Sequence, residues 1–258
     1  METTLRLDIL PQPDETTCGP TCLHAVYRYY GLEGGLMELI GQIERLENGG
    51  TLGVLLANHA LKRGLRATIH TYNLRLFDPT WFSTPGVDLA KKLRAQARVK
   101  ESKRLRLSTK GYLEFLRRGG RVVFDDLTDE VLFGPLSRGT PILTGLSATY
   151  LYRCPREYGD AGEFDDVRGT PQGHFVVLCG CDRRTRKVLV ADPLSPNPPF
   201  GRHFYELDVD RVKHAILLGI VTYDSVVVVL EPPPGWRGSV EQGGGNGRAR
   251  GGKRSPRR

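Results

Sequence analysis

The chain has 258 residues and a mass of 28.7 kDa, with 39% hydrophobic and 26% charged residues, which excludes global disorder and is enough for a packed core. Its formal net charge is +8, but two segments carry the excess: residues 236–258 hold seven Lys/Arg against one Glu, and residues 90–121 hold twelve against two. A basic segment of this kind is typically a solvated face or tail, so the charge does not indicate specific nucleic-acid binding.

The N-terminal segment and the cysteines bear on location. The first 17 residues contain four acidic residues and no long apolar run, unlike a secretory signal peptide. The most apolar stretch, 215–230, is shorter than the roughly 20 residues of a membrane helix. Five cysteines, an odd number, favour free thiols in a reducing compartment. We therefore expect a cytoplasmic protein without membrane insertion.

The first half of the chain has the periodicity of helices. A helix is predicted over 18–30, because apolar residues recur at helical spacing, Pro20 suits the first turn and Gly31 suits the C-terminal cap. The elements predicted after it are helices at 36–46 and 52–63, a short strand at 68–72, and helix-compatible stretches at 88–116 and 127–136.

The second half is rich in β-type runs. The predicted strands are 141–146, 174–181, 187–191, 204–207 and 225–230, with one helix from 208 to 218 that Asp208 can cap. Because helices come first and strands second, without strict alternation, we expect an α+β fold. Residues 1–232 would form one domain, in which a helical N-terminal half packs on an antiparallel sheet. Residues 233–258, rich in Gly and Arg, would form a disordered basic tail.

Cys18 is the candidate nucleophile. It lies at the predicted start of a helix, where backbone N–H groups favour an anion and so the reactive thiolate. Gly19 would let a substrate carbonyl approach closely. Six residues upstream of the cysteine, Gln12 offers an amide donor that could join the Cys18 N–H in stabilising an oxyanion.

His174 and Asp192 are the candidate partners of Cys18. They lie on two strands that the polar turn 182–186 joins into a hairpin. If Cys181 faces Lys187, then Asp192 is a diagonal neighbour of His174 on the same face. His174 could take the Cys18 proton, and Asp192 could orient the imidazole, which are the roles of a nucleophilic triad.

Three motifs resemble those of one peptidase family. They are Gln12 and Asp14 with Cys18-Gly-Pro, then Gly173-His-Phe-Val-Val, and last Val190-Ala-Asp-Pro. In this order they resemble the C39 and C39-like cysteine peptidases of the papain-like superfamily, and segment 72–81 is similar to free-standing bacterial members without a transporter fusion. The resemblance implies a papain-like fold and a peptide or protein substrate.

The family resemblance also implies roles for single residues. Cys18 would be the nucleophile, His174 the base, Asp192 the orienting acid and Gln12 the oxyanion donor, with no metal or organic cofactor. We assign Gly19 and Gly173 to substrate binding, since they adjoin the nucleophile and the base.

Other interpretations remain open. The same thiol could serve an acyl- or peptidyl-transferase, or the cleft could be a non-catalytic peptide-binding module. Cys22 is expected to be a core residue, and a zinc site at Cys154, Cys179 and Cys181 has only weak support from the spacing. The Arg/Gly tail could bind an anionic partner weakly. The sequence does not predict the natural substrate or the oligomeric state.

Overall fold

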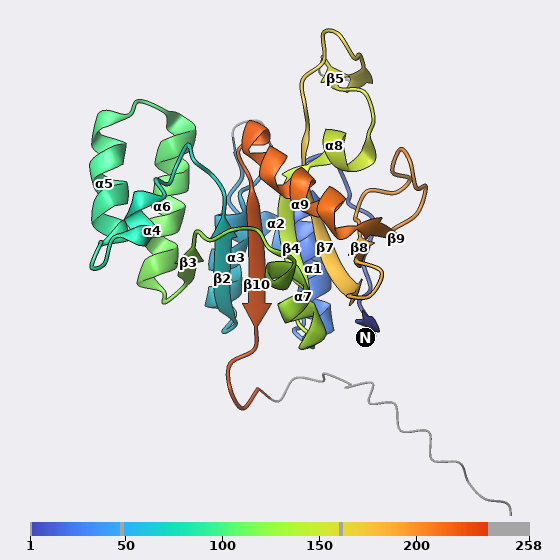
Figure 1. Cartoon of the computed structure of the whole chain (residues 1–258), viewed down its shortest axis with the longest axis horizontal. Coiled ribbons are helices and arrows are strands. Elements are labelled where there is room, and N and C mark those ends of the chain that lie inside the picture. Colours follow the sequence, from blue (N-terminus) through green and yellow to red (C-terminus); the bar gives the residue numbers. More distant parts are fainter. Residues whose placement is uncertain (1, 47–48, 160–161, 237–258) are drawn as a thin grey trace, which may run out of the picture.

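An eight-stranded sheet forms the centre of the computed structural model, which describes residues 2–46, 49–159 and 162–236. The strand order is β3-β2-β10-β4-β7-β8-β9, with β1 also beside β7, and every pair is antiparallel except β2 and β3. The strands are β1 (Glu2–Thr4), β2 (Arg66–Thr71), β3 (Arg121–Val123), β4 (Ile142–Ser147), β7 (Gly173–Asp182), β8 (Lys187–Ala191), β9 (Phe204–Asp208) and β10 (Val226–Glu231). A separate pair, β5 (Glu157–Tyr158) and β6 (Glu163–Phe164), projects from one end of the fold (Figure 1).

Helices cover both faces of the sheet. In Figure 1, α9 crosses in front of it, while α1 and α3 lie behind it. The helices are α1 (Cys18–Tyr29), α2 (Leu36–Gln42), α3 (Gly53–Lys62), α4 (Thr80–Ser83), α5 (Leu89–Val99), α6 (Lys103–Arg117), α7 (Asp129–Ser137), α8 (Ala148–Tyr152), α9 (Val209–Leu218) and a 3₁₀ turn (Gly219–Thr222). Buried apolar side chains from Leu5 to Leu230 form one core cluster. In the described part of the chain, no helix is long and apolar enough to cross a membrane.

The α+β class and the main elements are confirmed, with differences at element ends. The helix predicted over 36–46 ends at Gln42. The stretch 88–116 forms two helices instead of one, because Ser102 begins a new helix by accepting a hydrogen bond from the Leu105 N–H. The short elements β1, β3, β5, β6, α4 and α8 were not predicted.

The predicted tail lies mostly outside the described residues. Residues 237–258 are not described, so disorder there stays a prediction. Just before them, the Trp236 indole N–H donates to the Tyr30 carbonyl at 3.3 Å, so the described chain ends in contact with the end of α1.

The predicted register of the β7–β8 hairpin is wrong beside the turn. Lys187 pairs with Asp182 rather than with Cys181, which pairs with Val188. A slip of one residue sends every side chain to the opposite face of a sheet. If this register continued along the whole hairpin, His174 and Asp192 would lie on opposite faces of the sheet.

A β-bulge restores the predicted pairing further along the hairpin. Cys179 has no partner on β8, the ladder moves by one residue, and Val177 pairs with Ala191 as predicted. His174 and Asp192 therefore reach the same face because of the bulge, and the prediction that they meet is correct for a reason that the sequence did not reveal.

We expect Gly180→Ala to destabilise the fold, because a Cβ on Gly180 would lie 2.8 Å from the Thr3 carbonyl oxygen and 3.1 Å from the Leu189 Cβ. Such overpacking costs about 1–3 kcal/mol. Gly41→Ala is the matched control, since a Cβ there meets nothing within 4 Å and alanine favours the helix. Urea denaturation measures both variants, and equal stabilities would contradict this close packing around Gly180.

Candidate active site

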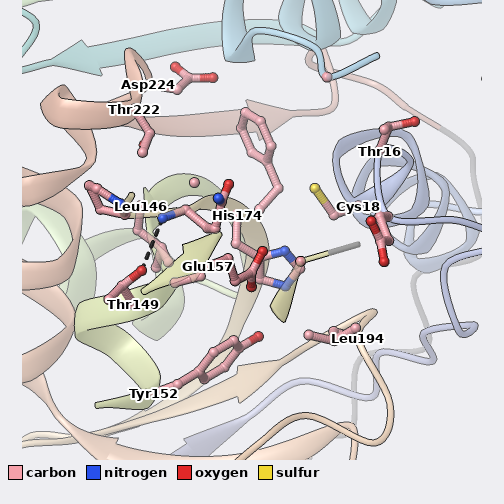
Figure 2. A pocket seen from close by; sticks show the side chains of 18 of the residues that line it. Thr16, Cys18, Leu146, Thr149, Tyr152, Glu157, His174, Leu194, Thr222 and Asp224 are labelled. Atoms are coloured by element: carbon pink, nitrogen blue, oxygen red, sulfur yellow. Dashed lines mark hydrogen bonds between the residues drawn. The ribbon is translucent and has the colours of Figure 1, made fainter. Parts of the chain in front are cut away.

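A cleft of about 610 Å³ brings together residues from distant parts of the sequence. Cys18, His174, Gln12 and Gly173 all line it, so four of the six predicted site residues share one cavity. Figure 2 shows Cys18 and His174 at its centre, between Asp224 on one side and Leu194 on the other.

Cys18 is the first residue of α1, and its side chain is half-buried. The preceding Thr17 is the N-cap but forms no side-chain capping bond with the helix; its hydroxyl donates to the Asp14 carbonyl at 3.0 Å. The first backbone N–H groups of a helix have no acceptor within the helix. The Cys18 N–H can therefore bind an anion that forms next to the sulfur.

His174 is buried at the start of β7 and donates from Nε2 to Asp192 Oδ1 at 2.8 Å. Because a carboxylate only accepts, Nε2 carries a proton and Nδ1 is left for Cys18. Burial lowers the pKa of His174, but the Asp192 charge and the contact with Cys18 outweigh it and raise that pKa to about 10. The charged imidazolium is thus stable beside the thiol at neutral pH.

Asp192 is fully buried and accepts four hydrogen bonds. Oδ1 accepts from His174 and from the Leu194 N–H at 2.9 Å, and Oδ2 accepts from the hydroxyls of Tyr152 at 2.8 Å and Tyr205 at 2.5 Å. Burial raises the pKa of Asp192, yet the charge of His174 and these bonds outweigh burial and hold it below the usual value. The carboxylate is therefore ionised and fixed in orientation.

The two tyrosines were missed by sequence reasoning. Tyr205 pairs with Val190, two residues before Asp192, so it lies on the face of the sheet that carries Asp192. The predicted strand at 204–207 could have suggested this contact if its pairing with β8 had been predicted. Tyr152 lies in the five-residue helix α8, which has no sequence pattern long enough to detect.

Tyr205→Phe is expected to lower the free energy of unfolding by about 1.5–3 kcal/mol, the usual contribution of a hydrogen bond to a charged group. It should also slow alkylation of Cys18 at neutral pH, because Asp192 would hold the imidazolium less well. Tyr30→Phe, which loses a buried bond of 2.8 Å to the Leu230 carbonyl, is the control. The control should lose stability without a change in alkylation, and equal alkylation by both variants would contradict the assignment.

Gln12 lies in a loop that is hydrogen-bonded to the motif containing Asp192 and to its own motif. Its backbone N–H donates to the Pro193 carbonyl at 2.9 Å, and its side-chain amide donates to the Asp14 carbonyl at 2.9 Å. The amide has a second hydrogen, which is the one that an oxyanion in the cleft could use. The position of Gln12 is consistent with the oxyanion role, which stays a prediction.

The two predicted substrate-binding glycines differ in position. Gly173 lines the cleft, whereas Gly19 is buried and is not among the lining residues. A Cβ on Gly19 would lie 2.7 Å from Thr51 Cγ2 and 3.3 Å from Phe175 Cδ2. Gly19 therefore lets the first turn of α1 pack closely against Thr51 and against Phe175 of β7.

The remaining cysteines have different surroundings. Cys22 is buried in the core, where its thiol lies 3.2 Å from the Phe175 carbonyl, as expected for a core residue. Cys154 lines the cleft and is half-buried. All five cysteines are free. Within the described ranges, no group of three or more His, Cys, Asp and Glu side chains could hold a metal ion.

Asp224 and Arg104 also line the cleft, and the sequence did not mark them. Asp224 Oδ2 accepts from the Gly53 N–H at the start of α3 at 2.7 Å. Burial raises the pKa of Asp224 to about 7, against the opposing effects of Gly53 and Arg104. Arg104 donates to the Thr222 carbonyl at 2.9 Å and stacks on the Tyr223 ring at 4.2 Å. These contacts place an acidic and a basic side chain in the same cleft.

Comparison with solved structures shows which known proteins have a similar fold. The chain is similar to a structure described as a C39-like peptidase of Bacillus anthracis, with a TM-score of 0.50 and 14% identity over 90% of this chain and 98% of that one. It also matches the peptidase domain of Streptococcus ComA, a bifunctional ABC transporter (TM-score 0.39, 13% identity, 87% and 98% covered). A third match is a double glycine motif protease from an AMS/PCAT transporter in complex with its leader peptide (TM-score 0.41, 11% identity, 90% and 95% covered).

No family model and no curated protein matches the chain. At these identities the likeness concerns the fold. The expected resemblance to the C39-like, papain-like fold is confirmed.

Proposed function

We propose that this chain, which has the fold of a C39-like peptidase, is a cysteine peptidase that cleaves peptide or protein substrates. The observation that carries the proposal is the buried His174–Asp192 pair, 2.8 Å apart, beside Cys18 at the start of a helix. A pure binding module has no need of a buried, charge-stabilised imidazole next to a cleft thiol.

The proposed reaction runs in two steps. At neutral pH His174 Nδ1 already holds the Cys18 proton, and the thiolate sulfur attacks the substrate carbonyl carbon, whose oxygen becomes an oxyanion bound by the Cys18 N–H and Gln12. The imidazolium then gives the proton to the leaving amine, the C–N bond breaks, and a thioester remains on Cys18. Water, activated by the neutral imidazole, releases the acid and restores the thiol. Asp192 keeps the ring in place throughout.

The five free cysteines support a reducing, cytoplasmic location for this enzyme. A peptidase requires its thiol reduced and unpaired, which such a compartment maintains.

The proposal is tested by incubating the full chain with a mixed peptide library and identifying new termini by mass spectrometry. Cys18→Ala is the control for contaminating proteases. New termini that depend on Cys18 support the proposal. Their absence with the unmodified chain, across a diverse library, would overturn it. Products joined to an added amine would instead indicate a transferase.

A further inference from the structure

The helical hairpin of α5 and α6 borders the cleft. In Figure 1 it stands at the left of the sheet, where α6 packs against α3 and α5 packs against α6. Arg104, in the first turn of α6, lines the cleft that holds Cys18. Because Arg104 belongs to α6, the hairpin adjoins the cleft at this residue.

Three exposed cations form a stripe along α5. Lys91, Arg94 and Arg98 follow the spacing i, i+3 and i+7, so they lie on one side of the helix. We call them the α5 cationic stripe. None of them forms an ion pair with a carboxylate of the described residues, and neither does the exposed Arg106 on α6.

Other cations of the same hairpin do have acidic neighbours. Lys110 pairs with Glu44 at 3.2 Å, and Arg117 and Arg118 pair with Glu114 at 2.8 and 2.5 Å. These ion pairs compensate part of the positive charge of the hairpin, whereas the stripe has no such pair among the described residues.

The stripe opposes helix formation in the absence of a ligand. Like charges at i,i+3 or i,i+4 destabilise a helix, and Lys91–Arg94 and Arg94–Arg98 are two such pairs. An acidic chain laid along the stripe would turn this repulsion into attraction. Charge complementarity therefore points to an anionic occupant.

The surface of the hairpin favours an acidic peptide over single-stranded RNA. Proteins that bind single strands combine cations with exposed aromatic rings on which bases stack. The aromatic residues of α5 and α6 are Tyr112 and Phe115, and both are buried. The stripe offers charge without a stacking platform.

We propose that the α5 cationic stripe binds an acidic segment of the polypeptide that occupies the cleft. As a statement about the substrate, this inference rests on the proposed function. The binding itself can be measured without cleavage, because a chain with Cys18→Ala retains the surface.

The test measures the Kd of a fluorescein-labelled peptide with six consecutive Glu residues by fluorescence anisotropy, using the full chain with Cys18→Ala at 50 mM salt. Adding Lys91→Gln, Arg94→Gln and Arg98→Gln should weaken binding at least tenfold, because three cations that contact the anion are removed. Glutamine favours helix formation, so α5 should persist, which circular dichroism checks. Raising the salt to 200 mM should weaken peptide binding by the parent far more than peptide binding by the triple variant.

The matched control removes the same charge from exposed arginines elsewhere, with Arg138→Gln, Arg184→Gln and Arg202→Gln. It should change the Kd less than twofold. Equal weakening by both triple variants, or no weakening by the α5 variant, would overturn the proposal in favour of net charge or other segments. Tighter binding of a six-nucleotide RNA than of the peptide, lost in the α5 variant, would overturn the peptide assignment. If the library yields no Cys18-dependent products while the α5 variant still loses peptide binding, the proposed function fails and the binding surface stands.

Discussion

Replacing His174 by alanine is expected to slow alkylation of Cys18 by iodoacetamide at pH 7 by about tenfold, because an unassisted cysteine is only a few per cent thiolate there. Amide cleavage should fall by about a thousandfold or more, since the variant also loses the proton donor for the leaving amine. Alkylation is followed by mass spectrometry of the Cys18 peptide, and cleavage by the peptides identified with the library. Unchanged alkylation would show that the imidazole does not activate the thiol.

The raised pKa of His174 makes the stability difference between the parent and His174→Ala depend on pH. Because that pKa rises from 6.5 to about 10 on folding, the charged imidazole stabilises the fold fully below about pH 6.5, and the contribution is lost as the pH rises toward 10. The difference in unfolding free energy between the parent and His174→Ala should therefore be largest near pH 6 and shrink by pH 10. A difference that stays constant over this range would contradict an imidazolium held by Asp192.

Replacing Asp192 by alanine is expected to cost about 3–5 kcal/mol of stability, enough to unfold many domains. The carboxylate is fully buried, and its removal leaves His174, the Leu194 N–H and two tyrosine hydroxyls without their acceptor. Each unsatisfied buried donor carries a desolvation penalty. Chemical denaturation measures the loss, provided that the variant folds.

Asp192→Asn separates the charge from the packing. The amide keeps one oxygen as an acceptor for His174 and a similar volume, so the variant should fold with a smaller loss. Without the negative charge, burial would lower the pKa of His174, and neutral alkylation of Cys18 should fall nearly as far as in His174→Ala. A variant that is less stable but alkylated at the parent rate would show that Asp192 is only structural.

The positions of the candidate triad were predictable because each has a local sequence signal. Cys18 begins a helix, His174 is the second residue of a strand, and Asp192 directly follows a strand and precedes a proline. The bulge at Cys179 that aligns the last two has no such signal. The N-terminal segment contacts it, because the Leu5 N–H donates to the Cys179 carbonyl at 2.8 Å, a bond between residues far apart in the sequence.

The buried carboxylate network was predictable only in part. The hairpin brings Asp192 and His174 to neighbouring strands, and the bulge puts them on one face, but the two tyrosines that also bind Asp192 come from β9 and from the short helix α8. Residues that meet only in the tertiary structure give no pattern along the chain. Their partners can be read from sequence only where a strand pairing is already known, as for Tyr205.

The measurement that tests the central claim most directly is alkylation of the native chain by iodoacetamide over a pH series, with Cys18 and Cys154 quantified in the same sample. Both line the cleft and both are half-buried, but burial raises the pKa of Cys154, and only Cys18 lies beside His174. We predict that Cys18 reacts at least tenfold faster than Cys154 near neutral pH and that His174→Ala removes the difference. Equal rates for the two cysteines, or a folded chain in which Cys18 does not react, would contradict a thiol activated for catalysis.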